Sequence, residues 1–470
     1  MANRKNRAVV KFGGSNLRSK EDLQKILKVI RYYNTPLIII VSACYGVTDM
    51  LINAISLARQ RKGSVEEIKR SLKNIHFEII DFYMKESRQG ILVKSKTMDL
   101  INEVGKLIHG IYFKKEVPGS LEDKILSFGE KLASHILTSV LKSKKNKVRE
   151  YLPENIGLKT DGNFHEASID YNISGKNLKK HLPPDITCVI PGFYGVSGDG
   201  RITLFGRGGS DYSATSIARC LNAGSVDLWK DVHGFMSADP EHINNPKNIS
   251  ILSYDEAAEL SYFGAKILHP RTFEPLYNKD IPIRIFNINN FSRSLSPLTI
   301  IKTGKGAIRK TIKSITFSKD FGILKLKGPG VGITPGILAE VSSALHNTKV
   351  NIKSVITSQT AINILISRSD LEQCTKIINE KRIKQIEKIE KIGDISVIAV
   401  VGNGLSEGTG IASRIFAAVS LHNINIRLIS AGASNAAIYF IVNKEETSIA
   451  VKAVHNEFFN KFKRRITNEK

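Results

Sequence analysis

Apolar and polar positions follow two alternating patterns along the first forty residues. An apolar run at 8–12 (AVVKF) is followed by two glycines, by apolar positions at helical spacing over 21–32, and by a second apolar run at 36–41 (PLIIIV). This order of strand, glycine turn, helix and strand predicts a βαβ unit. Such a unit implies a parallel sheet that is covered by helices.

The same patterns continue to about residue 300. Apolar positions recur at helical spacing with few breakers from about Thr48 to His109, which predicts one long helical stretch. Further strand and helix units are expected around 186–195 (ITCVIPGFYG), 226–234 (VDLWKDVHG) and 281–288 (IPIRIFNI). We therefore expect one large α/β domain with its functional loops at strand ends.

The last third of the chain contains an internal duplication. Residues 321–366 align without a gap with residues 395–440, at an offset of 74 positions. The matched pairs include three glycines, Gly328 with Gly402, Gly330 with Gly404 and Gly336 with Gly410. Each copy reads as strand, glycine-containing loop, helix, strand and strand. The duplication predicts two small βαββ modules with complementary sheets.

Composition and cysteine spacing narrow the class of protein. The 470 residues are 42% apolar and 24% charged, which is typical of a soluble globular protein of about three domains. No apolar run approaches the roughly 20 residues that span a bilayer, and no secretory signal follows the basic start. The four cysteines lack CxxC spacing. We expect a cytoplasmic protein with reduced thiols, no metal site and no membrane partner.

The charge balance raises the question of a polyanionic partner. Lysine and arginine number 69 against 44 aspartate and glutamate residues, a net charge of +25. A basic surface attracts nucleic acid, but these residues are spread along the chain without an RNP-type motif or zinc-finger spacing. We favour solvated basic surfaces over nucleic-acid binding, and polyanion binding remains an alternative.

Two glycine pairs mark the first candidates for chemistry. Lys11 precedes Gly13 and Gly14 at the end of the first strand, where glycine N–H groups, the start of a helix and an ammonium group would suit a phosphate. The segment is neither a GxxxxGK[ST] loop nor a GxGxxG fingerprint. A plain strand-to-helix turn explains it equally well.

The second pair adds a guanidinium, which suits a carboxylate or a phosphate. Arg207 stands before two glycines at another expected strand-to-helix junction, with Ser210 or Asp211 as the expected N-cap.

Two further segments carry charged side chains beside glycine. Glu130 follows a glycine at an expected helix start, where it could simply complement the helix dipole. Residues 227–240 (DLWKDVHGFMSADP) predict a loop that could wrap a nucleotide, and Lys266, beside another glycine, could reach a phosphate.

Five segments in this order resemble the aspartate kinases of the amino-acid-kinase superfamily. They are KFGGS, SFGEKLAS, FGRGGSDYSATSIA, DLWKDVHGFMSADP and ELSYFGAKILHPRT. The duplicated modules resemble the paired ACT domains of those enzymes. The resemblance implies an α/β kinase domain of three αβα layers over 1–305. Two α+β, ferredoxin-like ACT domains over 313–388 and 389–470 would follow.

The resemblance also implies a reaction. ATP would phosphorylate the β-carboxylate of L-aspartate to 4-phospho-L-aspartate, the first step of lysine, threonine and methionine synthesis. Lysines, glycine N–H groups and Mg²⁺ are the equipment that phosphoryl transfer needs. Two alternatives stay open, another acyl-phosphate kinase such as a glutamate or acetylglutamate kinase, and a catalytically weak amino-acid sensor.

Site residues follow from the same resemblance. The catalytic set is Lys11, Gly13, Gly14 and Asp211. The substrate-binding set is Ser15, Ser42, Thr48, Glu130, Arg207, Gly208, Gly209 and Ser210, in which Arg207 would grip the α-carboxylate and Glu130 the ammonium group. The nucleotide-binding set is Lys11, Lys230, Asp231, Met236, Asp239 and Lys266. No residue is assigned to a metal.

Three positions in the expected nucleotide loop depart from the family. Lys230, Met236 and Glu241 stand where its members commonly have threonine, tyrosine and arginine. The last change replaces a phosphate-binding cation by an anion. We therefore expect a weakened affinity for ATP, which Glu241→Arg should improve.

Regulation through the ACT pair is a further implication. The expected effector site, at an interface of a homo-oligomer, is formed by Gly336, Ile337, Leu338, Asn351, Thr357, Ser358 and Gln359. Lysine-inhibited relatives carry an aspartate near position 353. Because this chain has Lys353 there, which would repel a cationic effector, we favour threonine, or no strong feedback, over lysine.

Overall fold

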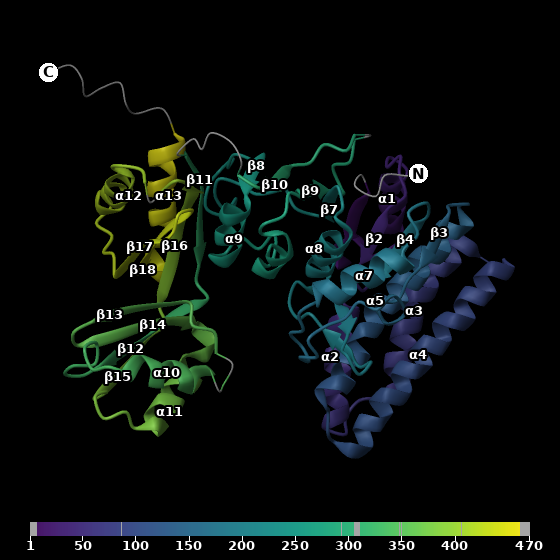
Figure 1. Cartoon of the computed structure of the whole chain (residues 1–470), viewed down its shortest axis with the longest axis horizontal. Helices are drawn as coiled ribbons and strands as arrows, with labels where there is room; N and C mark the ends of the chain where they lie inside the picture. Colours follow the sequence, from purple (N-terminus) through teal and green to yellow (C-terminus); the bar gives the residue numbers. More distant parts are fainter. Residues whose placement is uncertain are drawn as a thin grey trace. The chain divides into compact units, whose positions relative to one another are not determined.

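The computed structural model describes residues 7–85, 87–292, 294–304, 311–346, 348, 350–405 and 407–460. The chain divides into two compact units (Figure 1). The first unit contains the described residues of Met1–Phe235, Asn248–Ala258 and Lys266–Lys305. The second unit contains those of Met236–Lys247, Glu259–Ala265 and Gly306–Lys470. The helix α9 (Tyr254–Tyr262) contributes residues to both.

The first unit is built on an eight-stranded sheet in the order β3-β4-β2-β1-β7-β9-β10-β8. The strands are β1 (Ala8–Phe12), β2 (Ile38–Val41), β3 (Val148–Glu150), β4 (Thr187–Pro191), β7 (Ser225–Lys230), β8 (Ile251–Ser253), β9 (Ile283–Asn287) and β10 (Thr299–Lys302). Neighbouring strands are parallel, except that β10 runs antiparallel to β9. A separate ribbon pairs β5 (Tyr194–Val196) with β6 (Ile202–Leu204).

Helices cover both faces of this sheet. They are α1 (Lys20–Ile30), α2 (Val47–Arg59), α3 (Val65–Met84), α4 (Arg88–Lys114), α5 (Gly119–Ser143), α6 (Pro153–Ile156), α7 (Tyr171–His181) and α8 (Gly209–Leu221). Val10 and Phe12 share a core with apolar residues of α1 and α5. Because side chains alternate along a strand, Lys11 faces the other side, where α8 contacts β1, β2 and β7. The predicted three-layer α/β fold is confirmed.

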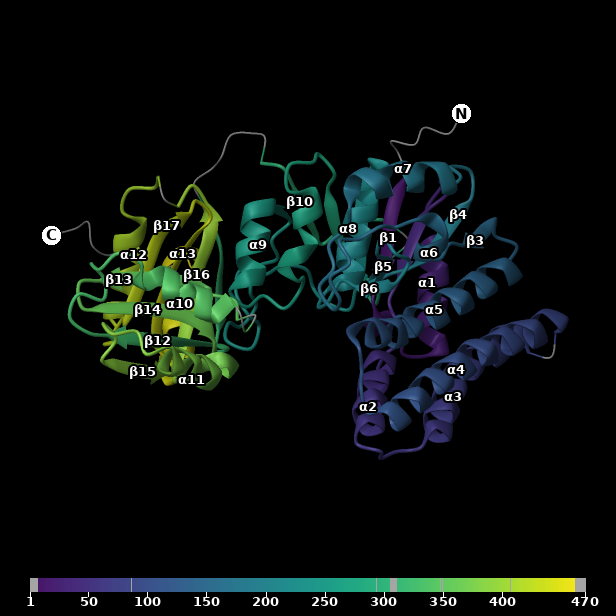
Figure 2. The ribbon, with the colours of Figure 1, turned by 60° about the horizontal axis from the view of Figure 1, so that its bottom comes forward.

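The prediction of one long helix from Thr48 to His109 is wrong. Three helices, α2, α3 and α4, occupy that range, and α3 and α4 form a hairpin (Figure 2). Gly63 has a φ of +79°, and the next residue, Ser64, caps α3 by accepting a hydrogen bond from the N–H of Glu67. Ser87 caps α4 in the same way. Both breaks fall in short polar stretches, 59–64 (RQRKGS) and 85–90 (KESRQG), which the prediction of a single helix overlooked.

The second unit contains two four-stranded sheets, in the orders β13-β14-β12-β15 and β11-β16-β18-β17. Their strands are β11 (Thr311–Ser318), β12 (Phe321–Lys327), β13 (Ser354–Ser358), β14 (Ala361–Ser367), β15 (Lys388–Ile392), β16 (Ile395–Asn403), β17 (Leu428–Ser434) and β18 (Ala437–Asn443). The helices are also duplicated: α10 (Ile337–His346) corresponds to α12 (Ile411–Ser420), and α11 (Leu371–Lys381) corresponds to α13 (Thr447–Phe459).

The predicted βαββ duplication is confirmed by element order. β12, α10, β13 and β14 are repeated as β16, α12, β17 and β18. Each sheet takes its fourth strand from outside its own copy, since β15 pairs with β12 and β11 pairs with β16. The exact domain limits near 305, 313 and 388 stay a prediction, because β11 belongs to the sheet of the second copy.

Candidate active site

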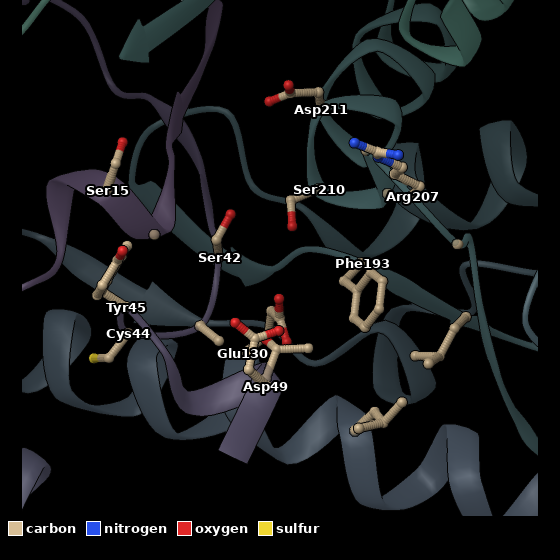
Figure 3. A pocket seen from close by; sticks show the side chains of 18 of the residues that line it. Ser15, Ser42, Cys44, Tyr45, Asp49, Glu130, Phe193, Arg207, Ser210 and Asp211 are labelled. Atoms are coloured by element: carbon tan, nitrogen blue, oxygen red, sulfur yellow. The ribbon is translucent and has the colours of Figure 1, made fainter. Parts of the chain in front are cut away.

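A cavity of about 560 Å³ opens at the carboxyl ends of β1 and β2 (Figure 3). Its lining comes from the loops after these strands, from α5, from the loop after β6 and from the first turn of α8. The predicted residues that line it are Lys11, Gly14, Ser15, Ser42, Thr48, Glu130, Arg207, Gly208, Gly209, Ser210 and Asp211. Figure 3 shows Ser15 and Ser42 on one side, Arg207 and Asp211 on the other, and Glu130 below and between them.

Two lysines share one carboxylate at the sheet end of the cavity. The Nζ of Lys11 lies 2.7 Å from Oδ1 of Asp211, and the Nζ of Lys230 lies 2.9 Å from its Oδ2. The side chains of Lys11 and Asp211 are each 7% exposed. The three groups carry a net charge of +1 when all are ionised. Such a cluster can attract a phosphate without leaving an unpaired buried charge.

The ionisation of this cluster is held in place by mutual attraction. Burial alone would raise the pKa of Asp211, but Lys11 and then Lys230 outweigh it and hold the pKa well below its ordinary value. Burial lowers the pKa of Lys11, and Asp211 opposes that shift. A Cβ at Gly13 would lie 3.4 Å from the Lys11 Nζ, so a glycine there leaves the ammonium group accessible.

Glu130 supplies a buried carboxylate at the floor of the cavity. Its side chain is 3% exposed, and Oε2 has no hydrogen-bond partner among the described residues. Burial raises its pKa to about 8, although the backbone of Ala43 and the charge of Lys11 lower it. The expected helix start at Glu130 is wrong, because the residue lies inside the 25-residue helix α5. An unpaired, buried carboxylate of this kind is suited to receive a cation.

The loop after β6 presents a guanidinium to the cavity. Arg207 is exposed, and no ion pair or hydrogen bond joins it to another residue of the described ranges. Gly208 has a φ of +74° and is the N-cap of α8, so the predicted capping by Ser210 or Asp211 is wrong. A Cβ at Gly208 would lie 2.5 Å from the Cβ of His269, which explains why no larger residue fits.

A polar network joins the ends of β1 and β7 beside the cavity. The Ser15 hydroxyl donates to Oδ1 of Asp231 at 3.0 Å, and the Arg18 guanidinium donates to Oδ2 at 3.2 Å. The same guanidinium lies 4.6 Å above the ring of Tyr45, which is 60% exposed. The glycine pair leads here into a short 3-10 helix, Gly14–Asn16, rather than directly into α1 as expected.

Five of the six predicted nucleotide residues do not line the cavity, namely Lys230 and Asp231, described above, and Met236, Asp239 and Lys266. The carbonyl of Met236 accepts a hydrogen bond from Ser314, and the carboxylate of Asp239 caps its own turn. Both belong to the second unit, whose core contains the intervening Ala238. Lys266 is an exposed residue of the first unit. A nucleotide role for all five stays a prediction.

Several lining residues were not predicted from the sequence. They are Ala43, Cys44, Tyr45, Gly46, Asp49, Leu126, His165, Phe193, Leu204 and Gly206. His165 has a φ of +68°, and its Nδ1 lies 2.8 Å from the fully buried Asp123. Only Gly206 stands in one of the five motifs, so local sequence patterns do not reveal the others.

The predicted effector residues all lie in the first βαββ copy. Gly336 precedes α10 with a φ of +92°, Ile337 is buried and Leu338 is 41% exposed. Thr357 and Ser358 lie on the edge strand β13. The remaining two, Asn351 and Gln359, are exposed. Their role in binding an effector stays a prediction.

The fold is α/β, and the cavity at its strand ends lies beside a charge cluster of two lysines and one aspartate. The model of the amino acid kinase family matches residues 6–287, and models of the ACT domain match 316–380 and 398–458. The first match covers more than half of the chain. The chain therefore belongs to the amino acid kinase family. No helix of the described residues combines the length and apolarity needed to cross a membrane.

The relatives are aspartate kinases. Aspartokinase 1 of Arabidopsis thaliana chloroplasts is 29% identical over 96% of this chain and 80% of its own length. The bifunctional aspartokinase/homoserine dehydrogenase of Buchnera aphidicola is 28% identical over 96% of this chain, but the chain spans only 57% of that protein.

Solved structures agree with these relatives. The aspartate kinase of Clostridium acetobutylicum is 27% identical, with a TM-score of 0.75 over 96% of this chain and 100% of its own. Aspartokinase III of E. coli in complex with aspartate and ADP has a TM-score of 0.81 at 24% identity, over 97% of this chain and 100% of its own. At that identity the similarity concerns the fold alone. The predicted resemblance and the predicted class, an ATP-dependent kinase with ACT domains, are confirmed.

Proposed function

We propose that this chain transfers the γ-phosphoryl group of ATP to the β-carboxylate of L-aspartate, yielding 4-phospho-L-aspartate and ADP. The observation that carries the proposal is that one cavity holds an acidic side chain and two basic ones. The unpaired carboxylate of Glu130 and the exposed guanidinium of Arg207 both line it, beside the ammonium group of Lys11. An amino acid with a second carboxylate has an ammonium group that suits Glu130, one carboxylate that suits Arg207 and another that suits Lys11.

Each end of the substrate has a residue that suits it. Arg207 binds the α-carboxylate through two parallel N–H bonds, and Glu130 binds the ammonium group. Ser42 and Thr48 line the same cavity and contribute hydroxyl groups. With both backbone groups held, the β-carboxylate extends toward Lys11.

The transfer itself requires charge neutralisation more than proton movement. An oxygen of the substrate carboxylate forms a bond to the γ-phosphorus while the bond to the β–γ bridging oxygen breaks, and that electron pair leaves on ADP. The acceptor is already ionised, so no base is needed. Lys11 and the N–H groups of Gly13 and Gly14 stabilise the charge on the transferred group, and Asp211 orients Lys11.

The nucleotide end would use Lys230 and Asp231, with Met236, Asp239 and Lys266 as the remaining predicted contacts. Mg²⁺ supplies additional charge neutralisation when it is bound to ATP.

An acceptor panel tests the proposal. The protein is mixed with ATP, Mg²⁺ and hydroxylamine, and hydroxamate formation is measured with L-aspartate, L-glutamate or N-acetyl-L-glutamate. We expect product with aspartate only. Product with glutamate or its acetyl derivative would select another acyl-phosphate kinase. No product from folded protein that still binds an amino acid would select the sensor.

Regulation by a pathway amino acid at the ACT pair of a homo-oligomer is a second part of the proposal. Its support is the half-buried Lys353, whose Nζ lies 4.9 Å above the ring of Tyr262 in the same unit. A second ammonium group nearby would be repelled, which favours threonine over lysine. Inhibition curves with each amino acid test this choice, and potent inhibition by lysine alone would contradict it.

The wider context belongs to the same proposal. The reaction would be the first step of lysine, threonine and methionine synthesis in the cytoplasm. The kinase domain would occupy 1–305 and the two ACT domains 313–388 and 389–470, in agreement with where the family models match.

A further inference from the structure

Strand register places a second lysine beside Lys11. In the parallel pairing of β1 with β7, Lys11 is opposite Leu228 and Phe12 is opposite Trp229. Side chains alternate between the two faces of a strand, so Lys230 points to the same face as Lys11. It lies one register position beyond Phe12, beside the glycine turn. Lys230 is therefore directed to the place where a phosphate would meet that turn.

Asp211 is the common partner of both lysines. Lys230 donates a hydrogen bond to Oδ2 at 2.9 Å, while Lys11 faces Oδ1. The side chain of Lys230 is 16% exposed, so it is more accessible than the other two. An ammonium group on a flexible stem can exchange one oxygen partner for another without leaving the site.

The neighbours of Lys230 at the end of β7 are fixed by packing and hydrogen bonds. On the opposite face, the ring of Trp229 stacks on Phe286 with centroids 4.6 Å apart, and its Nε1 donates to the Tyr33 hydroxyl. The residue that follows Lys230 along the chain is Asp231, and its carboxylate accepts hydrogen bonds from Ser15 and Arg18. Any change of partner by Lys230 is thus confined to its side chain.

We propose that Lys230 is a second catalytic ammonium group, which moves from Asp211 to the oxygens of the transferred phosphoryl group. This inference rests on the proposed function. Lys230 forms hydrogen bonds to non-bridging oxygens while the acceptor oxygen binds phosphorus and ADP departs with the electron pair, and no proton is transferred. Neither Lys230 nor Lys266 lines the cavity, but Lys230 shares Asp211 with Lys11, whereas Lys266 is exposed.

Substitution of Lys230 tests the inference against a matched control. Lys230→Met removes the ammonium group and keeps the length of the stem, and Lys28→Met makes the same change on the exposed surface of α1. We expect Lys230→Met to lower kcat by roughly 10²–10³-fold, as loss of a transition-state donor does. KM for aspartate should stay within about twofold, and Lys28→Met should match wild type. Equal kcat in the two variants would overturn the inference.

A binding comparison separates this inference from the proposed function. Lys230→Met should bind a non-hydrolysable ATP analogue at least about tenfold more weakly, whereas ADP affinity should change by less than about twofold, because only the analogue carries the γ-phosphate. Equal losses for both nucleotides would overturn the role at the transferred group. If wild type makes no aspartyl phosphate, the proposed function fails, while this binding comparison still decides the placement of Lys230.

A pH profile tests whether the charge of Lys230 acts on Lys11. Burial, and to a smaller extent the charge of Lys230, lowers the pKa of Lys11, whereas Asp211 and Glu130 raise it. Lys230→Met should therefore move the alkaline limit of kcat to higher pH. If Lys230→Met does not fold, Lys230→Arg decides the question: it should retain more kcat than Lys230→Gln, and equal loss in both would overturn the inference.

Discussion

Glu130→Gln should stabilise the ligand-free protein at neutral pH while it impairs aspartate binding. The carboxylate is buried with an unpaired oxygen, and burial raises its pKa to about 8 from an ordinary value of 4.5. At pH 7 about nine-tenths of the ligand-free molecules therefore carry a protonated Glu130. Binding of a substrate ammonium group requires the ionised form, so aspartate binding should release most of one proton at this pH.

The sign and size of the stability effect follow from proton linkage. Between pH 4.5 and pH 8 the folded state holds a proton on Glu130 that the unfolded state has lost. The wild-type free energy of unfolding therefore falls by about 1.4 kcal/mol per pH unit from this group, and the contribution is lost as pH rises through the folded pKa. The variant has no such group. Its advantage over wild type should grow by roughly 2–3 kcal/mol between pH 5.5 and pH 7.5.

Urea unfolding at these two pH values measures the difference. Trp229 is the single tryptophan of the chain and is buried in the first unit, so its fluorescence reports on the unit that contains Glu130. In parallel, KM for aspartate should rise at least about tenfold, since a hydrogen bond to a charged group is lost. A stability difference that does not change with pH would refute the reasoning about burial, and an unchanged KM would refute the ammonium role.

Three further predictions concern other parts of the molecule. Arg207→Lys should raise KM for aspartate by about tenfold with a smaller change in kcat, because a lysine cannot make the two parallel bonds; equal KM in steady-state kinetics would contradict this. Asp227→Asn should destabilise the first unit by about 3 kcal/mol in urea, because it breaks a buried ion pair with Arg284, and a loss below 1 kcal/mol would count against it. Gly332→Ala should lower the unfolding temperature of the second unit, because a Cβ there would lie 1.7 Å from the Ser358 carbonyl oxygen. The control Gly110→Ala, in open space on α4, should be neutral or stabilising, and similar behaviour of the two alanine variants would disprove the argument.

The parts of the fold that were predictable are those with local patterns. The βαβ opening and the duplicated βαββ copies follow from apolar periodicity and glycine turns, which operate within a few residues. The position of Glu130 was not predictable in this way. Gly129 suggested a helix start, but a Cβ there would lie 2.8 Å from the Cβ of Ala43, so the glycine serves the close approach of α5 to a loop. Tertiary packing of this kind leaves no periodic pattern.

The candidate site shows the same division. Motifs identified Lys11 and Asp211 as chemically suitable, yet their contact across 200 positions depends on the register of β1 with β7 and on the placement of α8. The pairing of Lys230 with Asp211 follows from that register and from no motif. Arg18 and His165 approach the cavity through long-range contacts with Asp231 and Asp123, which the sequence around them does not indicate.

The central claim is that this cavity makes an acyl phosphate on aspartate with Lys11 at its centre. Phosphorus-31 NMR of the protein with ATP, Mg²⁺ and L-aspartate tests it most directly. We predict a new acyl-phosphate resonance that grows as ADP forms, disappears on addition of hydroxylamine and is absent with Lys11→Met. ADP formation without that resonance, or the same resonance at an undiminished rate with Lys11→Met, would contradict the account.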